Sequence, residues 1–386
     1  MIRVTIISQA AELGGAERSL LTFLKAAHGR TVAATVLMPR EGPLGELLTE
    51  LGVPWQVVSM PTGLLLQSRQ NHHPLGLFAK LLYQGPGYLG RLAGAIRRTN
   101  PEVIYSNGIK SNLLSALLGP LLQLGVVWHV RDHWRGALET WLADWGADLI
   151  IANSQSSATN LRTRMRRPGK VRVIYNAVDL EEFSPEGPVA DLAAFPKCRY
   201  KIALVAAFAK IKGQTLFIHA AERIRRAFPS ASFFLIGGSI YDTVGDREYE
   251  EEVHKTAEAK GVRDCVFFTG FQQNMAPWYR AMDIVVNASI VPESFGRTLL
   301  EAMACGKAVV GPNAGGIPEF VQHVKNGLLY EMGNAEALAS AVLTLLRDPA
   351  FRERLGAAGR ETTMQRFAPQ AHAKAISRII KQVCLM

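Results

Sequence analysis

The sequence predicts an α/β fold with two doubly wound parallel sheets. The chain has 386 residues, more than one hydrophobic core usually holds, so two domains are expected. Short β-rich apolar runs alternate with amphipathic stretches along the whole chain. That alternation is typical of parallel sheets with helices on both faces. A Pro-rich, weakly periodic stretch at 184–199 divides the runs into two series.

The two series give the expected strands. The first series is expected at 4–8, 31–38, 55–60, 102–107, 125–130, 148–154 and 171–176, and the second at 200–208, 231–238, 265–271, 283–289 and 308–312. Open parallel sheets bind ligands at the carboxyl ends of their strands, so two Rossmann-like domains are expected to face a cleft. The expected parts are an N-terminal domain over 1–185, a C-terminal domain over 186–366, and a C-terminal helix over 367–386 that packs back on the N-terminal domain.

The composition restricts the partners and the compartment. The net charge of +10 favours an anionic partner, and nucleic acid, an anionic membrane and a phosphorylated substrate all satisfy it. The four cysteines are scattered without a CxxC pair, which argues against a zinc site or a disulfide framework and fits a reducing cytoplasm. The first apolar run is too short for a signal peptide, and no run of about 20 apolar residues predicts a membrane span.

Two windows without acidic residues are strongly basic. One lies between Glu50 and Glu102 and contains an apolar, arginine-bearing stretch at 74–98. That stretch fits either a surface that lies against a membrane or holds a lipid-linked acceptor, or a pair of core helices split at the Gly-Pro-Gly of 85–87. The other window covers 162–172, and a solvated face explains both windows about as well as an anionic partner does.

Two glycine-bearing turns follow expected strands. Gly14 and Gly15 come after strand 4–8 and open a helix, where glycines let backbone approach a ligand and helix amides attract anions. A plain βα turn explains the pair equally simply, and the absence of GxGxxG argues against a nicotinamide enzyme. Lys212-Gly213 follows strand 200–208, where a lysine can meet a phosphate as a point charge.

The most informative segment is PESFGRTLLEAMACG, which follows the expected strand at 283–289. Glu293 precedes a helix that begins near Arg297, and Glu301 lies about one turn inside it. The amides and the dipole of such a helix start suit a pyrophosphate, Glu301 can reach ribose hydroxyls, and Glu293 can meet a sugar ring. The alternative explanation of this spacing is that one of the two glutamates caps the helix and the other faces solvent.

PESFGRTLLEAMACGKAVVG, followed by GGIPE and NGLL, closely resembles the signature of the family-four retaining glycosyltransferases of GT-B architecture. Further matches follow in the same order along nearly the whole chain: GGAE, GPLGELLTELGV, HVRD, ANSQ, YNAVDLEEFSP, KGQ, FLIGG, FTGF and WYRAMDIVVNAS. The resemblance implies two Rossmann-like domains that bind a nucleotide-diphosphate sugar and transfer the sugar to a glycan or lipid-linked acceptor. It implies no metal and no cofactor besides the nucleotide sugar.

The resemblance also assigns residues. Glu293 and Lys212 would be catalytic, together with His129 or Arg131 after the fifth strand of the first domain, where His133 also lies near. The donor-binding positions would be Gly14, Gly15, Lys212, Gly238, Phe271, Ser294, Phe295, Gly296, Arg297, Thr298 and Glu301. The expected setting is bacterial exopolysaccharide, lipopolysaccharide or glycolipid synthesis in the cytoplasm, with peripheral membrane contact at the inner face of the cytoplasmic membrane and no nucleic acid.

One position departs from the family pattern. The family usually carries an arginine five residues before the Lys-Gly lysine, and this chain has Ala207 there. Either Lys210 takes the place of this arginine from a shifted backbone, or one contact between the protein and the donor phosphate is missing. This departure keeps a second interpretation open, a catalytically weak transferase-like subunit that binds nucleotide sugars. A sugar-nucleotide epimerase on a similar frame is the other alternative.

Overall fold

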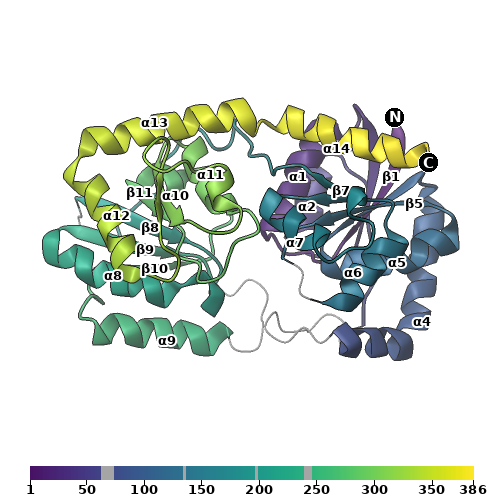
Figure 1. Cartoon of the computed structure of the whole chain (residues 1–386), viewed down its shortest axis with the longest axis horizontal. Helices are drawn as coiled ribbons and strands as arrows, with labels where there is room; N and C mark the ends of the chain where they lie inside the picture. Colours follow the sequence, from purple (N-terminus) through teal and green to yellow (C-terminus); the bar gives the residue numbers. More distant parts are fainter. Residues whose placement is uncertain (62–73, 134–135, 196–198, 239–245) are drawn as a thin grey trace. The chain divides into compact units, whose positions relative to one another are not determined.

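The computed structural model describes residues 1–61, 74–133, 136–195, 199–238 and 246–386. The chain divides into two compact units (Figure 1). Unit 1 comprises Met1–Ala177 with Pro369–Met386, and unit 2 comprises Val178–Ala368.

Unit 1 contains a seven-stranded parallel sheet with the order β3-β2-β1-β4-β5-β6-β7. Its strands are β1 (Ile2–Ser8), β2 (Val32–Met38), β3 (Trp55–Val57), β4 (Val103–Asn107), β5 (Gly125–Val130), β6 (Leu149–Ala152) and β7 (Val171–Val173). Its helices are α1 (Gly15–Ala27), α2 (Pro43–Glu50), α4 (Pro74–Thr99), α5 (Ile109–Leu122), α6 (Ala137–Gly146), α7 (Gln155–Arg162), η1 (Pro168–Lys170) and α14 (Pro369–Cys384).

The sheet of unit 1 is buried on both faces, which explains why its strands are almost continuously apolar. Trp128 on β5 packs into one core, with α4, α5 and α6. The other core contains Phe23 from α1 and Val127 from β5, and α14 adds Ile376 and Ile380. Figure 1 shows α14 running beside α1 in this unit. The C-terminal helix is therefore an integral layer of unit 1.

Unit 2 contains a six-stranded parallel sheet with the order β10-β9-β8-β11-β12-β13. Its strands are β8 (Tyr200–Val205), β9 (Ala231–Ile236), β10 (Val266–Gly270), β11 (Ile284–Val286), β12 (Ala308–Pro312) and β13 (Leu328–Tyr330). Its helices are η2 (Lys210–Lys212), α8 (Gln214–Ala227), α9 (Asp246–Ala259), α10 (Ala276–Ala281), α11 (Arg297–Ala304), η3 (Ile317–Glu319), α12 (Ala335–Arg347) and α13 (Pro349–Arg366). The fold class is thus confirmed, with one doubly wound parallel sheet in each unit.

The units divide at places that differ from the expected boundaries. The first division lies between Ala177 and Val178, ahead of the Pro-rich stretch at 184–199. The segment after Val178 belongs to unit 2 because it is anchored there. Val178 donates its amide to the carbonyl of Phe367, and Arg280 donates to backbone carbonyls of this segment, including that of Ser184.

The acid-free stretch at 74–98 lies within one helix, α4, so the split at 85–87 that formed part of the core-helix alternative does not occur. Pro86 lies inside the helix, where it removes one backbone hydrogen bond. Beyond it, Leu92, Ala95 and Ile96 are buried in the core of unit 1. Their burial holds the second half of α4 on the unit and supports the core-helix interpretation for that half.

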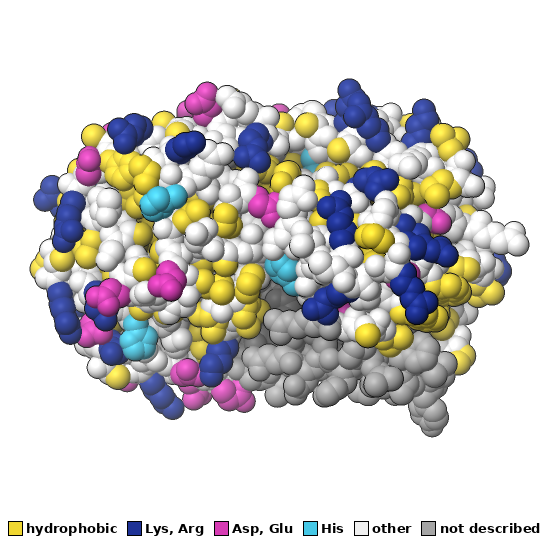
Figure 2. Space-filling model, in the orientation of Figure 1, with side chains coloured by type: hydrophobic (Ala, Val, Ile, Leu, Met, Phe, Trp, Pro, Cys, Tyr) yellow, Lys and Arg dark blue, Asp and Glu magenta, His cyan; other side chains and the backbone are white. Residues whose placement is uncertain are grey.

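The second acid-free window lies around η1 and makes local structural contacts. Lys170 donates to the carbonyls of Asp144 and Ala147, and Arg162 donates to the carbonyl of Val171. On the face of unit 1 that Figure 2 shows, Lys and Arg side chains are spread among hydrophobic ones. Part of the window's charge therefore serves local structure by donating to backbone carbonyl oxygens.

Prediction for the C-terminal helix. Ile376 is fully buried, so Ile376→Ala removes apolar contacts and leaves a cavity between α14 and the sheet. The free energy of unfolding of unit 1 is expected to fall by about 2–5 kcal/mol in urea titrations. Lys374→Ala, at an exposed position of the same helix, is the control and is expected to change it by less than about 0.5 kcal/mol. Equal effects of the two substitutions would show that α14 is not packed as described.

Candidate functional site

The candidate site of unit 2 lies where strands β8 and β11 are neighbours in the sheet. From β8 the chain proceeds to β9 and β10 on one side, whereas β11 leads to β12 and β13 on the other. Such a switch in strand order opens a crevice at the carboxyl ends of the strands, the usual ligand position in open α/β sheets. Lys212 follows β8 and Glu293 follows β11, so both expected residues lie at this switch point.

Lys212 and Glu293 form a direct ion pair. The Lys212 ammonium donates to Oε1 of Glu293 at 2.6 Å, and the hydroxyl of Ser289 donates to the same oxygen at 2.5 Å. The Glu293 side chain is only 14% exposed. Burial alone would raise the pKa of Glu293. The Lys212 charge and hydrogen bonds from Lys212, Ser289 and Asn287 outweigh it, so the pKa of Glu293 lies below its ordinary value. Glu293 is therefore held as a carboxylate.

Glycines allow the connections after three strands to meet around this pair. Gly213 has φ +70°, and a Cβ there would lie 1.9 Å from the carbonyl oxygen of Ala288. Gly315, after β12, has φ +66°, and its Cβ would lie 2.2 Å from the carbonyl oxygen of Glu293. The amide of Gly316 donates to that same carbonyl at 2.9 Å. Side chains at these positions would force the loops of β8, β11 and β12 apart.

Helix α11 begins at the same edge. Gly296 precedes it with φ +96°, and Arg297 is its first residue. The first amides of a helix have no acceptor within the helix, and its dipole places partial positive charge there. This helix start can therefore bind an anion at the same edge of the sheet as Lys212. Ser294 and Thr298 are half-buried around it, and Phe295 is buried.

Glu301 lies one turn inside α11 and is 3% exposed. Arg297 donates through Nε to its Oε1 at 2.6 Å, and the hydroxyl of Tyr279 donates to its Oε2 at 2.9 Å. Each carboxylate oxygen can accept about two hydrogen bonds, so ribose hydroxyls still have lone pairs to bind. The sequence predicted Glu301 but did not indicate the two side chains that hold it.

Gly238 and Phe271 lie together at the ends of β9 and β10. A Cβ at Gly238 would lie 3.3 Å from the amide nitrogen of Phe271, whose side chain is 47% exposed. The exposed aromatic ring of Phe271 thus lies beside the backbone of Gly238. This arrangement can accept a nucleotide base.

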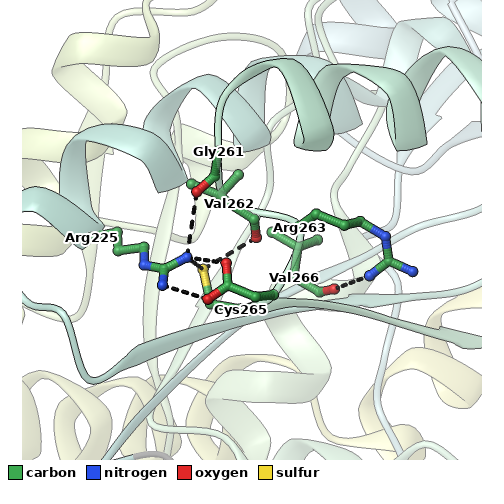
Figure 3. Close-up of polar contacts among 7 residues, drawn as sticks. Arg225, Gly261, Val262, Arg263, Cys265 and Val266 are labelled. Atoms are coloured by element: carbon green, nitrogen blue, oxygen red, sulfur yellow. Dashed lines mark hydrogen bonds and ion pairs between the residues drawn. The ribbon is translucent and has the colours of Figure 1, made fainter.

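The amino ends of the unit 2 strands carry a different polar cluster (Figure 3). Arg225, in the last turn of α8, pairs with both oxygens of Asp264 and donates to Sγ of Cys265 at 3.2 Å. Asp264 and Cys265 directly precede β10, so this cluster lies at the sheet edge opposite to Lys212 and Glu293. It joins α8 to the sheet and serves the fold.

In unit 1 the corresponding switch in strand order lies between β1 and β4. Gly14 caps α1 and Gly15 is its first residue, at the end of the connection that follows β1. A Cβ at Gly15 would meet no atom within 4 Å, so this helix start has open space around it. The expected Gly-Gly turn is therefore placed where an anion can approach the amides of α1.

Arg131 makes hydrogen bonds to several elements at the same edge of unit 1. It directly follows β5 and is 7% exposed. Its guanidinium donates to Asn107 at 3.0 Å, to Ser19 at 2.6 Å and to Asn176 at 2.6 Å. Arg131 therefore joins the ends of β4 and β5, helix α1 and the segment after β7. Sequence reasoning missed all three partners because they come from distant parts of the chain.

His129 lies inside β5 with no exposed surface, and its Nδ1 is hydrogen-bonded to the Tyr105 hydroxyl. Burial lowers the pKa of His129 well below its ordinary value, and the positive charge of Arg131 and the nearby His372 add to this shift. The structure therefore places His129 inside the sheet and Arg131 at the end of the strand.

Among the described residues, no group of three or more His, Cys, Asp or Glu side chains could hold a metal ion. In the same part of the chain, no helix has both the length and the apolar character needed to cross a bilayer.

Comparisons with known proteins agree with this geometry. Residues 13–182 match the family model described as Glycosyltransferase Family 4, and residues 193–362 match Glycosyl transferases group 1. The chain belongs to the family-four glycosyltransferases. Its fold is GT-B: the structure of Anabaena Alr3699/HepE in complex with UDP and glucose aligns with a TM-score of 0.84 at 24% identity, over 99% of this chain and 100% of that one.

Curated relatives match part of this family-four chain. A D-inositol 3-phosphate glycosyltransferase of Kribbella flavida is 33% identical over 221 residues, which cover 56% of this chain and 52% of the relative. The lipopolysaccharide core biosynthesis glycosyltransferase LpsE of Rhizobium meliloti is 31% identical over 173 residues, or 45% of this chain and 47% of the relative. The chain thus spans about half the length of these relatives.

Position 207, where the family usually has an arginine, carries the uncharged side chain of an alanine in this structure. Ala207 is half-buried after β8, and its carbonyl accepts a hydrogen bond from Gln214 at 2.9 Å. Lys210 is exposed in the same short helix as Lys212. This glycosyltransferase therefore presents lysines at the end of β8 and no arginine.

Prediction for the pH dependence of the ion pair. Since the pKa of Glu293 is lowered from 4.5 in the folded chain, its charge stabilises the fold above that pH, and this stabilisation is lost as the pH falls through the lowered pKa. The difference in free energy of unfolding between wild type and Glu293→Gln is expected to be constant above about pH 5 and to shrink below about pH 4.5 in urea titrations. Glu353→Gln, at an exposed position of α13 in the same unit, is the control. The same pH dependence in both variants would contradict the ion pair.

Proposed function

We propose that this chain is a retaining glycosyltransferase that moves a sugar from a nucleotide-diphosphate sugar to a glycan or lipid-linked acceptor. The observation that carries the proposal is the Lys212–Glu293 pair at the switch point of unit 2, beside the start of α11. A cation and helix amides next to a charged carboxylate are suited to a ligand that joins a diphosphate to a hydroxyl-rich sugar.

The donor would bind to unit 2 and the acceptor to unit 1. Lys212 and the amides after Gly296 would hold the diphosphate, Glu293 the hydroxyls of the donor sugar, and Glu301 the ribose. The base would lie against Phe271. In unit 1, Gly14 and Gly15 open α1 at the carboxyl edge of the sheet, and Arg131 would hold the strand ends that form that edge.

In the proposed retaining transfer, the nucleotide diphosphate leaves from the face of the sugar that the acceptor oxygen attacks. Because the acceptor attacks on that same face, no enzymic nucleophile is required, and the acceptor proton passes to the departing phosphate oxygen, so no enzymic base is required either. The chain's contribution is to position both substrates and to stabilise the negative charge that develops on the diphosphate. Lys212 and the first amides of α11 supply that stabilisation, which makes the proposed reaction metal-independent.

We further propose a cytoplasmic enzyme at the inner face of the membrane that acts in polysaccharide, lipopolysaccharide or glycolipid synthesis. Relatives named for transfer to inositol 3-phosphate, for lipopolysaccharide core synthesis and for phosphatidylinositol mannosylation support this class of acceptor. The net charge of +10 supports contact with an anionic lipid surface.

A second candidate function is a catalytically weak subunit that binds nucleotide sugars and supports a partner. Ala207 favours it, because the end of β8 lacks the arginine that the family usually places there. The two candidates differ in one measurement, the release of nucleoside diphosphate from a nucleotide sugar by the isolated chain.

Prediction for the donor. In a thermal-shift screen of uridine, guanosine and adenosine diphosphate sugars, one donor is expected to raise the melting temperature. A ligand at 100 times its dissociation constant adds about 2.7 kcal/mol of stability. That donor is then expected to be hydrolysed slowly and used for transfer when an acceptor is present. Binding without any release of nucleoside diphosphate would favour the second candidate, and no binding of any nucleotide sugar would contradict both.

Prediction for the two glutamates. Glu301→Ala removes the proposed ribose acceptor and is expected to weaken nucleotide binding by about 10- to 100-fold, since hydrogen bonds to a charged group contribute about 1.5–3 kcal/mol. Glu293→Ala is expected to reduce kcat while nucleotide affinity changes little, because Glu293 would contact the sugar. Calorimetric titration and initial rates measure the two effects. Equal nucleotide affinity of wild type and Glu301→Ala would refute the ribose assignment.

A further inference from the structure

We propose that the outer side of α6 and the arginine-bearing loop beside it form a surface of unit 1 that docks on an anionic lipid bilayer. This surface, called the Trp–Arg face below, comprises Trp141, Trp145, Arg166 and Arg167. The inference rests on the proposed function for the membrane location of the acceptor, and it adds which residues of this chain make the contact.

Two exposed tryptophans lie one turn apart on α6. Trp141 is 54% exposed and Trp145 is 51% exposed. Their rings are stacked, with centroids 6.2 Å apart and planes only 4° from parallel. Of the tryptophans that the structure describes, these are the two that lie open to solvent. Because large aromatic rings contribute most when they are buried, a stacked pair left on the surface indicates a partner that covers it.

The opposite side of α6 determines where both rings point. Leu142 is buried in the core of unit 1. A Cβ at Gly146 would lie 2.5 Å from the Cβ of Ala116, so α6 lies directly against α5 (Figure 1). Trp141 and Trp145 are four residues apart and share the side of the helix away from these contacts. The two rings are therefore presented together to a partner outside the unit.

Positive charge is fastened next to Trp145. The carboxylate of Asp144 accepts the backbone amides of Arg166 and Arg167 at 2.8 Å each. This anchor uses only backbone amides, so it does not occupy the guanidinium groups. Both arginine side chains are exposed, and they lie within the acid-free window at 162–172. Aromatic rings and cations are thus held together on one surface of unit 1.

The chemistry of the Trp–Arg face fits the interface of an anionic bilayer. Tryptophan is enriched where a bilayer meets water, because its ring is apolar and its N–H is polar. Arginines beside the rings would attract the anionic headgroups of the inner leaflet. A second copy of this chain is a poorer partner, since it would bring the same net charge of +10.

The stretch from which membrane contact was expected supplies less of such a surface. In the second half of α4, Leu92 and Ile96 are buried in the core of unit 1, so they cannot also enter a bilayer. The exposed aromatic rings of α6 need no rearrangement of the core to do so. The membrane contact is therefore assigned to α6 and its neighbouring loop.

Sedimentation of the full chain with vesicles tests the tryptophans. Wild type is expected to bind vesicles of phosphatidylglycerol mixed with phosphatidylcholine. Trp141→Ala/Trp145→Ala is expected to bind them about 10- to 100-fold more weakly, because two rings no longer enter the bilayer. Val324→Ala/Met364→Ala is the matched control, since these apolar side chains of unit 2 are 50% and 51% exposed. The control is expected to bind within about twofold of wild type.

A second pair of variants tests the charge. Arg166→Gln/Arg167→Gln keeps the backbone amides that anchor the loop, and it is expected to bind the anionic vesicles about 10- to 30-fold more weakly. Binding to vesicles of phosphatidylcholine alone is expected to be weak and to change little. Arg347→Gln/Arg354→Gln, at exposed positions of α12 and α13, removes the same charge from unit 2. This control is expected to bind the anionic vesicles within about twofold of wild type.

A wild type that does not bind the anionic vesicles would overturn the proposal, as would equal binding by wild type and the double tryptophan variant. Analytical ultracentrifugation tests self-association. A dimer that the tryptophan variant abolishes, together with no vesicle binding by wild type, would assign the face to a second copy of the chain and overturn the proposal.

Release of nucleoside diphosphate from the nucleotide sugars of the donor screen separates this inference from the proposed function. Because the Trp–Arg face is remote from the proposed chemistry, all four double variants are expected to release it within about twofold of the wild-type rate. No release by wild type would count against the proposed transferase, and vesicle binding would still decide the role of the Trp–Arg face. Release by wild type without vesicle binding would leave the transferase in place and overturn only the docking surface.

Discussion

The ion pair between Lys212 and Glu293 is the constraint on which the rest of the unit 2 site depends. The two residues come from connections after different strands, and they meet because β8 and β11 are neighbours where the strand order reverses. The pair also requires close backbone approach, which Gly213 and Gly315 permit at left-handed φ angles. Replacement of either glycine would move the carboxylate as well as the loop. The positions of the two charged side chains thus depend on the backbone geometry of the loops that carry them.

Much of the fold could be predicted because the strands of both sheets are buried on two faces and therefore read as continuous apolar runs. The same physics explains the misses. Leu328–Tyr330 forms β13, which is too short to be distinguished from a loop by its own pattern and is defined by pairing with β12. Pro86 suggested a break in α4, yet burial of Leu92 and Ile96 beyond it is worth more than one lost hydrogen bond.

The site could be predicted less completely, because a sequence gives positions along the chain and not the partners of a side chain. Lys212, Glu293 and Glu301 were indicated by their places after strands. Tyr279 and Ser289 were not predicted. Tyr279 donates to Glu301, which is distant in the sequence, and Ser289 donates to Glu293 across a turn. No local sequence pattern indicates that a hydroxyl has such a partner. His129 and Arg131 could not be separated without the end of β5. Once the strand ends at Val130, His129 falls inside the sheet and Arg131 at its rim.

The two carboxylates of the site are already neutralised by cations, which determines what kind of ligand it favours. A diphosphate that approaches Lys212 must share that ammonium with Glu293, so it exchanges one ion pair for another and gains little from Lys212 alone. The additional binding must come from groups that no carboxylate occupies, namely the first amides of α11. Those groups are spread over one helix turn and can reach more than one phosphate. The arrangement therefore favours a diphosphate over a single phosphate, and in the proposed function a sugar hydroxyl would replace Lys212 as a partner of Glu293.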